Sequence, residues 1–79
     1  MPHISVKMLG GRSEEQKKKL ADALVKTLTE ELHCSPHYVT CTVEDYTAEE
    51  WQGVFKKEIS DKPQERVYKK AEYDPKDLL

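Results

Sequence analysis

Pro2 is the residue whose chemistry depends most on its place in this sequence. While Met1 precedes it, the Pro2 nitrogen belongs to a tertiary amide and cannot act as a base. Removal of Met1, which a small second residue generally permits, turns that nitrogen into a secondary amine. Burial and a nearby cation both disfavour the charged form of an amine, and so they bring its pKa toward the range that a general base needs. The position therefore suggests proton transfer by an N-terminal proline.

Arg12 is the second candidate for chemistry. It follows Gly10 and Gly11 at an expected turn between a strand and a helix, where its guanidinium is free to project. A guanidinium binds a carboxylate or an enolate through two parallel hydrogen bonds, and its charge lowers the pKa of a neighbouring amine. The alternative is an exposed arginine near a helix start, and the spacing alone favours neither interpretation.

Four residues of metal-binding types lie close together in the sequence: His33, Cys34, His37 and Cys41. All four types bind zinc, but Cys41 falls inside an expected strand and points with its valines to the apolar side. Cys34 and His37 also have the types of a nucleophile and its base, yet no glycine elbow or helix N-terminus supports an activated thiol. We therefore expect no metal site at these residues.

Hydrophobic periodicity predicts two long elements after Pro2. Residues 3–9 alternate between apolar and polar side chains, which is typical of a half-buried strand. Ser13 and Gln16 have the spacing of a capping box, which marks a helix start. Leucines then recur at steps of three and four residues, so the sequence predicts a helix over residues 13–33 with one apolar stripe.

A second strand is expected over residues 38–46, which are rich in β-branched and aromatic side chains. Strand, long helix and strand in this order predict a parallel βαβ unit with a right-handed crossover, an α/β fold. Thr47 and Glu50 repeat the capping-box spacing and predict a short second helix. Residues 63–71 predict a last helical turn or two, and the tail of about residues 74–79 has no clear period.

Length and charge narrow the class of protein. The 79 residues indicate a single domain over residues 1–79 with a thin core. The net charge is −2 and the lysines are spread among glutamates, so nucleic acid is not expected as a partner. No stretch is long and apolar enough to span a bilayer, and two cysteines without an apolar leader suggest a cytoplasmic protein.

Because two strands under one helix are not stable alone, we expect a homo-oligomer, most simply a dimer whose sheets join or stack.

The sequence resembles the tautomerase superfamily, and within it the 4-oxalocrotonate tautomerase group, from Met1 to about Ser60. The resemblance rests on the alternating strand, the long helix and the second strand, together with Pro2 after Met1, Gly11-Arg12-Ser13, Glu15-Gln16-Lys17 and Trp51. None of these features is specific alone. Pro2 with Arg12 at this distance is the most characteristic combination.

This resemblance implies a role for each matching position. Pro2 is the expected general base, and Arg12 is expected to bind the substrate carboxylate or to stabilise an enolate. Trp51 stands where the group has a phenylalanine in the pocket, and Thr40 stands where 4-oxalocrotonate tautomerase has a second arginine. By this resemblance both are substrate-binding candidates, although Thr40 argues against a dicarboxylate. The implied activity is that of an isomerase, a cofactor-independent keto–enol tautomerase of a 2-oxo or 2-enol monocarboxylate.

The segment after Glu58 bears on assembly. With Lys69, Lys70 and Tyr73 it resembles a longer, dimeric branch that includes phenylpyruvate-type tautomerases, which favours a dimer over a hexamer. A competing interpretation is a non-catalytic, oligomerising βαβ module. In that protein Pro2 is merely the second residue.

Overall fold

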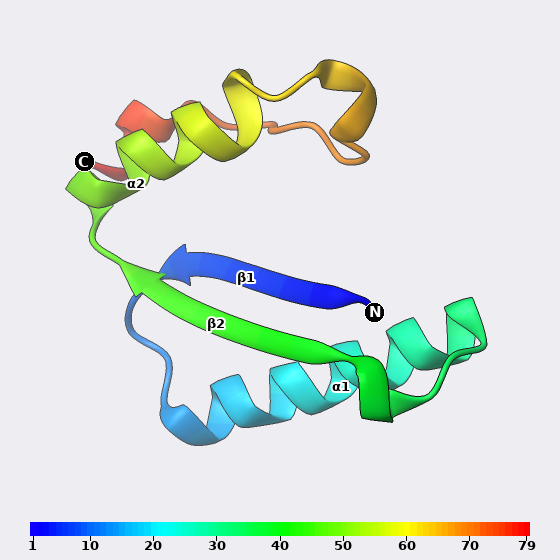
Figure 1. Ribbon diagram of the computed structural model, residues 1–79. Helices are drawn as coiled ribbons and strands as arrows, with labels where there is room; N and C mark the ends of the chain where they lie inside the picture. Colours follow the sequence, from blue (N-terminus) through cyan, green and yellow to red (C-terminus); the bar gives the residue numbers. More distant parts are fainter. The chain divides into compact units, whose positions relative to one another are not determined.

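The computed structural model describes all residues, Met1 to Leu79, which form two compact units, Met1–Asp45 and Tyr46–Leu79. Figure 1 shows the elements in chain order, from the blue N-terminus to the red C-terminus. They are β1 (His3–Leu9), α1 (Glu14–Leu32), a 3₁₀ turn (Pro36–Tyr38), β2 (Thr40–Tyr46), α2 (Ala48–Phe55), a π-helical turn (Lys56–Ser60) and two further 3₁₀ turns (Gln64–Arg66 and Pro75–Leu78).

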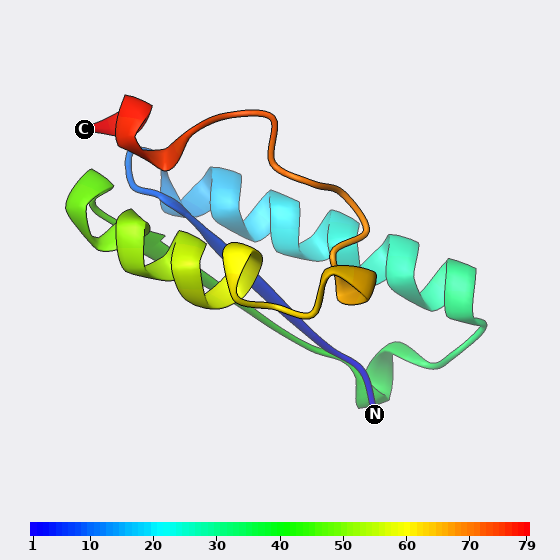
Figure 2. The ribbon, with the colours of Figure 1, turned by 90° about the horizontal axis from the view of Figure 1, so that it is seen from above.

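The first unit is a parallel βαβ unit, as the sequence predicts. β1 and β2 pair side by side and point the same way, and α1 runs back along one side of them (Figures 1 and 2). The pairing extends one residue beyond β1, because the Thr40 N–H donates a hydrogen bond of 3.2 Å to the Pro2 carbonyl oxygen. β2 begins later than expected because Ser35 caps the 3₁₀ turn that contains Tyr38, through a bond from the His37 N–H to its hydroxyl.

α1 is bounded by local hydrogen bonds close to the predicted limits. The Ser13 hydroxyl accepts from the Gln16 N–H at 3.1 Å, and the Gln16 side chain accepts from the Ser13 N–H at 2.9 Å, which completes the predicted capping box. At the other end His33 adopts a left-handed conformation, with φ of 53°, and its N–H donates to the Thr29 carbonyl. No helix in the structure combines the length and apolar character required of a membrane span.

The two faces of this small sheet differ in character. On the side of α1, Ile4 and the leucines at positions 24, 28 and 32 line an apolar groove. On the opposite face polar side chains pair across the strands, His3 with Thr40 and Lys7 with Glu44, and Lys7 also donates to Ser5 of its own strand. No residue of the chain is fully buried, and Leu32 is 60% exposed. The core of a single chain is therefore as thin as its length suggests.

The second unit is held together by its C-terminal segment. The predicted capping box of Thr47 and Glu50 starts α2. The Trp51 indole N–H donates to the Tyr73 hydroxyl at 3.0 Å, and the Tyr73 ring meets Phe55 edge to face with centroids 5.6 Å apart. Tyr73 is thus held against α2. The tail of residues 74–79, for which the sequence shows no period, also contacts this helix, because the Gln52 side-chain amide donates to the Pro75 carbonyl oxygen at 2.8 Å.

The prediction of a last helical turn or two in residues 63–71 is confirmed for one turn only. Only Gln64–Arg66 forms a 3₁₀ turn, and Val67 is already extended. Pro63 precedes this turn and supplies no side-chain hydrogen bond to its first N–H groups. Without a cap, such a short segment gains too little to continue as a helix. By contrast, the Asp74 side chain caps the turn Pro75–Leu78 by accepting from the Lys76 N–H.

Candidate active site

Pro2 lies at the first rung of the sheet. It is half-buried, and its carbonyl is fixed by the Thr40 N–H. Met1, in contrast, is 95% exposed. The bond between Met1 and Pro2 therefore joins an exposed residue to one that the sheet holds in place. Cleavage of this bond leaves the Pro2 nitrogen as the first atom of a strand whose direction is already set.

Arg12 lies at the opposite end of the same strand. β1 has seven residues, so at a rise of about 3.3 Å per residue its first and last Cα atoms are about 20 Å apart. Figure 1 shows the N-terminus at one end of β1 and the turn toward α1 at the other. The Arg12 side chain is exposed and forms no ion pair or hydrogen bond. Pro2 and Arg12 of one chain therefore cannot both contact one small substrate.

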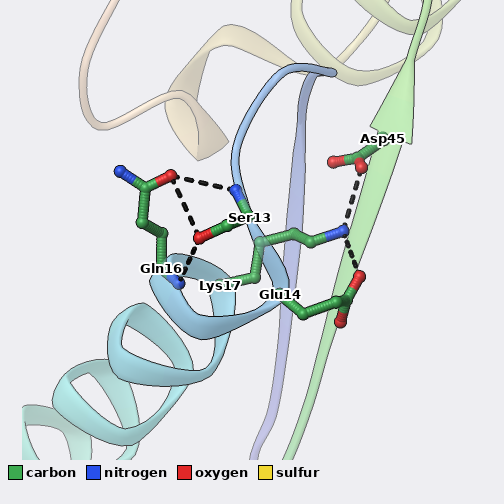
Figure 3. A network of polar contacts seen from close by, with 5 residues as sticks. All are labelled: Ser13, Glu14, Gln16, Lys17 and Asp45. Atoms are coloured by element: carbon green, nitrogen blue, oxygen red, sulfur yellow. Dashed lines mark hydrogen bonds and ion pairs between the residues drawn. The ribbon is translucent and has the colours of Figure 1, made fainter.

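A network of side chains holds the turn that carries Arg12 (Figure 3). Lys17, in the second turn of α1, reaches Glu14 at 2.8 Å and Asp45, at the end of β2, at 3.0 Å. The hydrogen bonds to Glu14 and then to Asp45 raise the pKa of Lys17, because they favour its charged form. The start of α1 is thereby tied to β2 on one side of the turn.

Gly11 gives this turn its shape. Its φ of 119° lies in the region that residues with a side chain rarely adopt. Gly10 has no such requirement, and a Cβ placed there would make an ordinary contact of 3.9 Å with the Asp45 Cβ. The backbone just before Arg12 thus depends on one specific glycine.

Thr40 lies beside Pro2, and its hydroxyl has a partner. The Thr40 Oγ1 is 2.7 Å from the His3 Nδ1. The resemblance described above makes Thr40 a substrate-binding candidate, whereas no pattern in the sequence points to His3. The alternation of the strand predicts that His3 lies on the face opposite α1. The strand register that pairs His3 with Thr40 cannot be predicted from the neighbouring residues.

Trp51, the other substrate-binding candidate, belongs to the second unit. Its indole N–H is engaged by Tyr73, so its ring offers an apolar surface and no free donor. Tyr46 meets the Trp51 ring with centroids 6.3 Å apart. Trp51 is therefore one member of an aromatic cluster with Tyr46, Phe55 and Tyr73.

The histidines and cysteines do not gather into a metal site. No group of three or more histidine, cysteine, aspartate or glutamate side chains is placed to hold a metal ion. Cys34 and Cys41 are both free and half-buried. Cys41 shares the half-buried side of β2 with Val43, as the strand alternation predicts.

The comparison with known families concerns most of these positions. The sequence model described as tautomerase enzyme matches residues 2–54, which include Pro2, Arg12, Thr40 and Trp51. The chain belongs to the tautomerase family. The βαβ unit described above is therefore a tautomerase fold, and the match runs beyond β2 into α2.

Curated relatives support the same assignment. A probable tautomerase of Xylella fastidiosa is 38% identical over 74 residues, covering 92% of this chain and 89% of that protein. One of Halalkalibacterium halodurans is 34% identical over 61 residues, covering 77% of this chain and 98% of that protein. One of Bacillus cereus is 36% identical over 62 residues, covering 78% of this chain and all of that protein. This tautomerase family member is thus similar over most of its length to proteins of comparable size.

Proposed function

We propose that this chain is a cofactor-independent keto–enol tautomerase of 2-oxo or 2-enol monocarboxylates, with the amine of Pro2 as general base after Met1 is removed. Membership of the tautomerase family supports this class of reaction. The family match begins at Pro2, and Met1 is almost fully exposed, which gives a peptidase access to it. Both observations support a free proline amine in the mature protein.

The reaction is an isomerisation in which one proton changes place. From the enol, the neutral Pro2 amine takes the hydroxyl proton and becomes charged. It then gives a proton to the adjacent carbon while the carbonyl forms, which restores the neutral amine. The Arg12 guanidinium binds the carboxylate and stabilises the negative charge of the intermediate enolate. A positioned base of this kind contributes about 10² to 10⁴ in rate.

The observation that carries the arrangement of the site is the placement of Pro2 and Arg12 at opposite ends of β1. The carboxylate and the reacting carbon of a 2-oxo acid are only a few bonds apart, whereas β1 spans about 20 Å. The Arg12 that serves a given Pro2 therefore comes from another copy. We propose a homodimer in which each copy supplies the base of one site and the cation of the other.

The exposure of the chain supports this self-association. No residue is fully buried, and lone domains of this length have little net stability without a disulfide, a metal or oligomerisation. Both cysteines are free. Association with a second copy would add the missing stability and would also complete the site.

The first test measures conversion of phenylenolpyruvate to its keto form. We expect Pro2→Ala to lower kcat/KM by about 10² or more and Arg12→Ala to raise KM, with Arg12→Lys intermediate because lysine keeps the charge but not the paired hydrogen bonds. A wild-type chain with an uncleaved N-terminal tag is the matched control, since its Pro2 nitrogen stays an amide. Equal activity in all of these proteins contradicts the proposal.

The second test asks whether two chains share a site. Pro2→Ala and Arg12→Ala chains are unfolded together and refolded as a mixture. A mixed dimer contains one intact site, so the mixture should recover roughly a quarter of the wild-type activity. If the mixture is no more active than the separate variants, Pro2 and Arg12 do not act across two copies.

A further inference from the structure

A single residue of β2 holds the first two residues of the mature chain. Through its backbone N–H, Thr40 donates a bond of 3.2 Å to the Pro2 carbonyl oxygen. Through its hydroxyl, Thr40 is 2.7 Å from the Nδ1 of His3. Both contacts lie at the end of the sheet where a free Pro2 nitrogen would sit.

These two contacts act where a strand is weakest. The ends of a chain fray unless they are tied down, and a proline has no N–H to add to the ladder. The backbone bond to Pro2 is at the long end of the usual range for an N–H donor, whereas the contact to His3 is short. The side-chain contact between His3 and Thr40 is therefore a second tie on the first rung, beside the backbone bond.

The structure assigns His3 and the Thr40 hydroxyl to a clamp that positions the Pro2 amine. A general base works only within hydrogen-bond reach of the proton that it takes, so the fraction of time that the first rung is closed enters the rate directly. The catalytic consequence rests on the proposed function, but the clamp itself does not. His3 is a positioning residue because it acts through Thr40 and the strand.

The clamp needs no particular tautomer of His3. A threonine hydroxyl can donate to an unprotonated Nδ1 or accept from a protonated one. What it does need is an oxygen at position 40. Thr40→Val removes that oxygen while keeping the backbone N–H and the branched shape, and Thr40→Ser keeps the oxygen.

The experiment compares these two variants with His3→Phe. Hydrogen exchange of the amide at position 40 is measured together with kcat and KM for phenylenolpyruvate. The loss of one hydrogen bond of this kind changes an equilibrium constant or a rate by a factor of about two to ten. We expect Thr40→Val and His3→Phe each to speed exchange and to lower kcat by such a factor, with KM little changed, and Thr40→Ser to stay close to wild type.

The double variant His3→Phe with Thr40→Val sharpens the result. Because both substitutions break the same contact, we expect the double variant to change the exchange rate and kcat no more than either single variant does. Additive effects, or unchanged exchange in both single variants, overturn the clamp. A rise in KM for Thr40→Val with unchanged exchange also overturns it and makes Thr40 a direct substrate contact.

The two proposals fail in different ways. Should Pro2→Ala keep full activity, the proposed function fails, while exchange at position 40 still decides whether the clamp exists. Should Pro2→Ala be inactive and exchange be insensitive to His3→Phe, only the clamp fails.

Discussion

The two units of this chain are ordered by different kinds of interaction. In Met1–Asp45, two paired strands and a helix of 19 residues set the course of the backbone, and Lys17 ties the helix to β2. In Tyr46–Leu79, the one α-helix has eight residues. There the order comes from side chains, above all from Trp51 and Phe55 meeting Tyr73.

This difference separates the candidate site residues. Pro2 and Arg12 owe their places to main-chain features, the first rung of a sheet and a glycine turn. Trp51 owes its place to rings and a hydroxyl contributed by residues distant in the sequence. Changes of backbone freedom should therefore act most on the first unit, and truncation of side chains most on the second.

The largest effect on stability is expected from Trp51→Ala. It removes the ring contact with Tyr46 and the hydrogen bond to Tyr73, and a half-buried indole should cost about 2 to 3 kcal/mol on truncation. Tyr73→Phe is the matched control, since it loses only the hydroxyl and about 1 kcal/mol. Urea unfolding and hydrogen exchange in α2 measure both, and equal losses would show that the rings contribute little.

Gly11→Ala is the corresponding change in the first unit. The φ of 119° is strained for alanine, so we expect a loss of about 1 to 2 kcal/mol and a weaker apparent affinity for substrate carboxylate. Gly10→Ala is the control, because its Cβ meets only an ordinary contact. If the two variants unfold at the same urea concentration, the turn before Arg12 is not conformationally constrained.

The two capping boxes allow a like-for-like comparison between the units. Ser13→Ala and Thr47→Ala each remove one cap, and each should cost about 1 kcal/mol in urea unfolding. Only Ser13→Ala loosens the turn beside Arg12. We therefore expect it alone to raise KM, and a rise of the same size with Thr47→Ala would contradict a separate role for the first cap.

The smallest effect concerns Lys17 and pH. Its pKa is raised in the folded protein by Glu14 and Asp45, so its contribution to stability is fully present below the unfolded value of about 10.4 and is lost as the pH rises through the higher folded value. Wild type should be slightly more stable than Lys17→Met at pH 8, and the gap should close at strongly alkaline pH. The exposed pair Lys18–Asp22 serves as a control that should show almost no gap.

The structural features that could be predicted from the sequence are those determined by residues close together in the chain. The bounds of β1, both capping boxes and the apolar stripe of α1 follow from patterns over a few residues. The docking of Tyr73 on Trp51 joins residues 22 apart, and the contact of His3 with Thr40 joins residues 37 apart. Such contacts depend on how elements meet, which no local period encodes.

The candidate site divides in the same way. Pro2 and Arg12 could be chosen by residue type and by their likeness to a family. Their separation follows from the strand predicted over residues 3–9, whose bounds the structure confirms. No sequence pattern singles out His3, because a histidine in an alternating strand resembles an ordinary outward-facing residue and its contact with Thr40 depends on the pairing of the strands.

The absence of any fully buried residue has a consequence for how the protein must be handled. Under the proposed self-association, mass action makes its thermal midpoint vary with protein concentration. Dilution into an assay then lowers the stability of the protein, because it lowers the fraction of associated chains. Melting curves of such a chain have meaning only beside the concentration at which they were recorded.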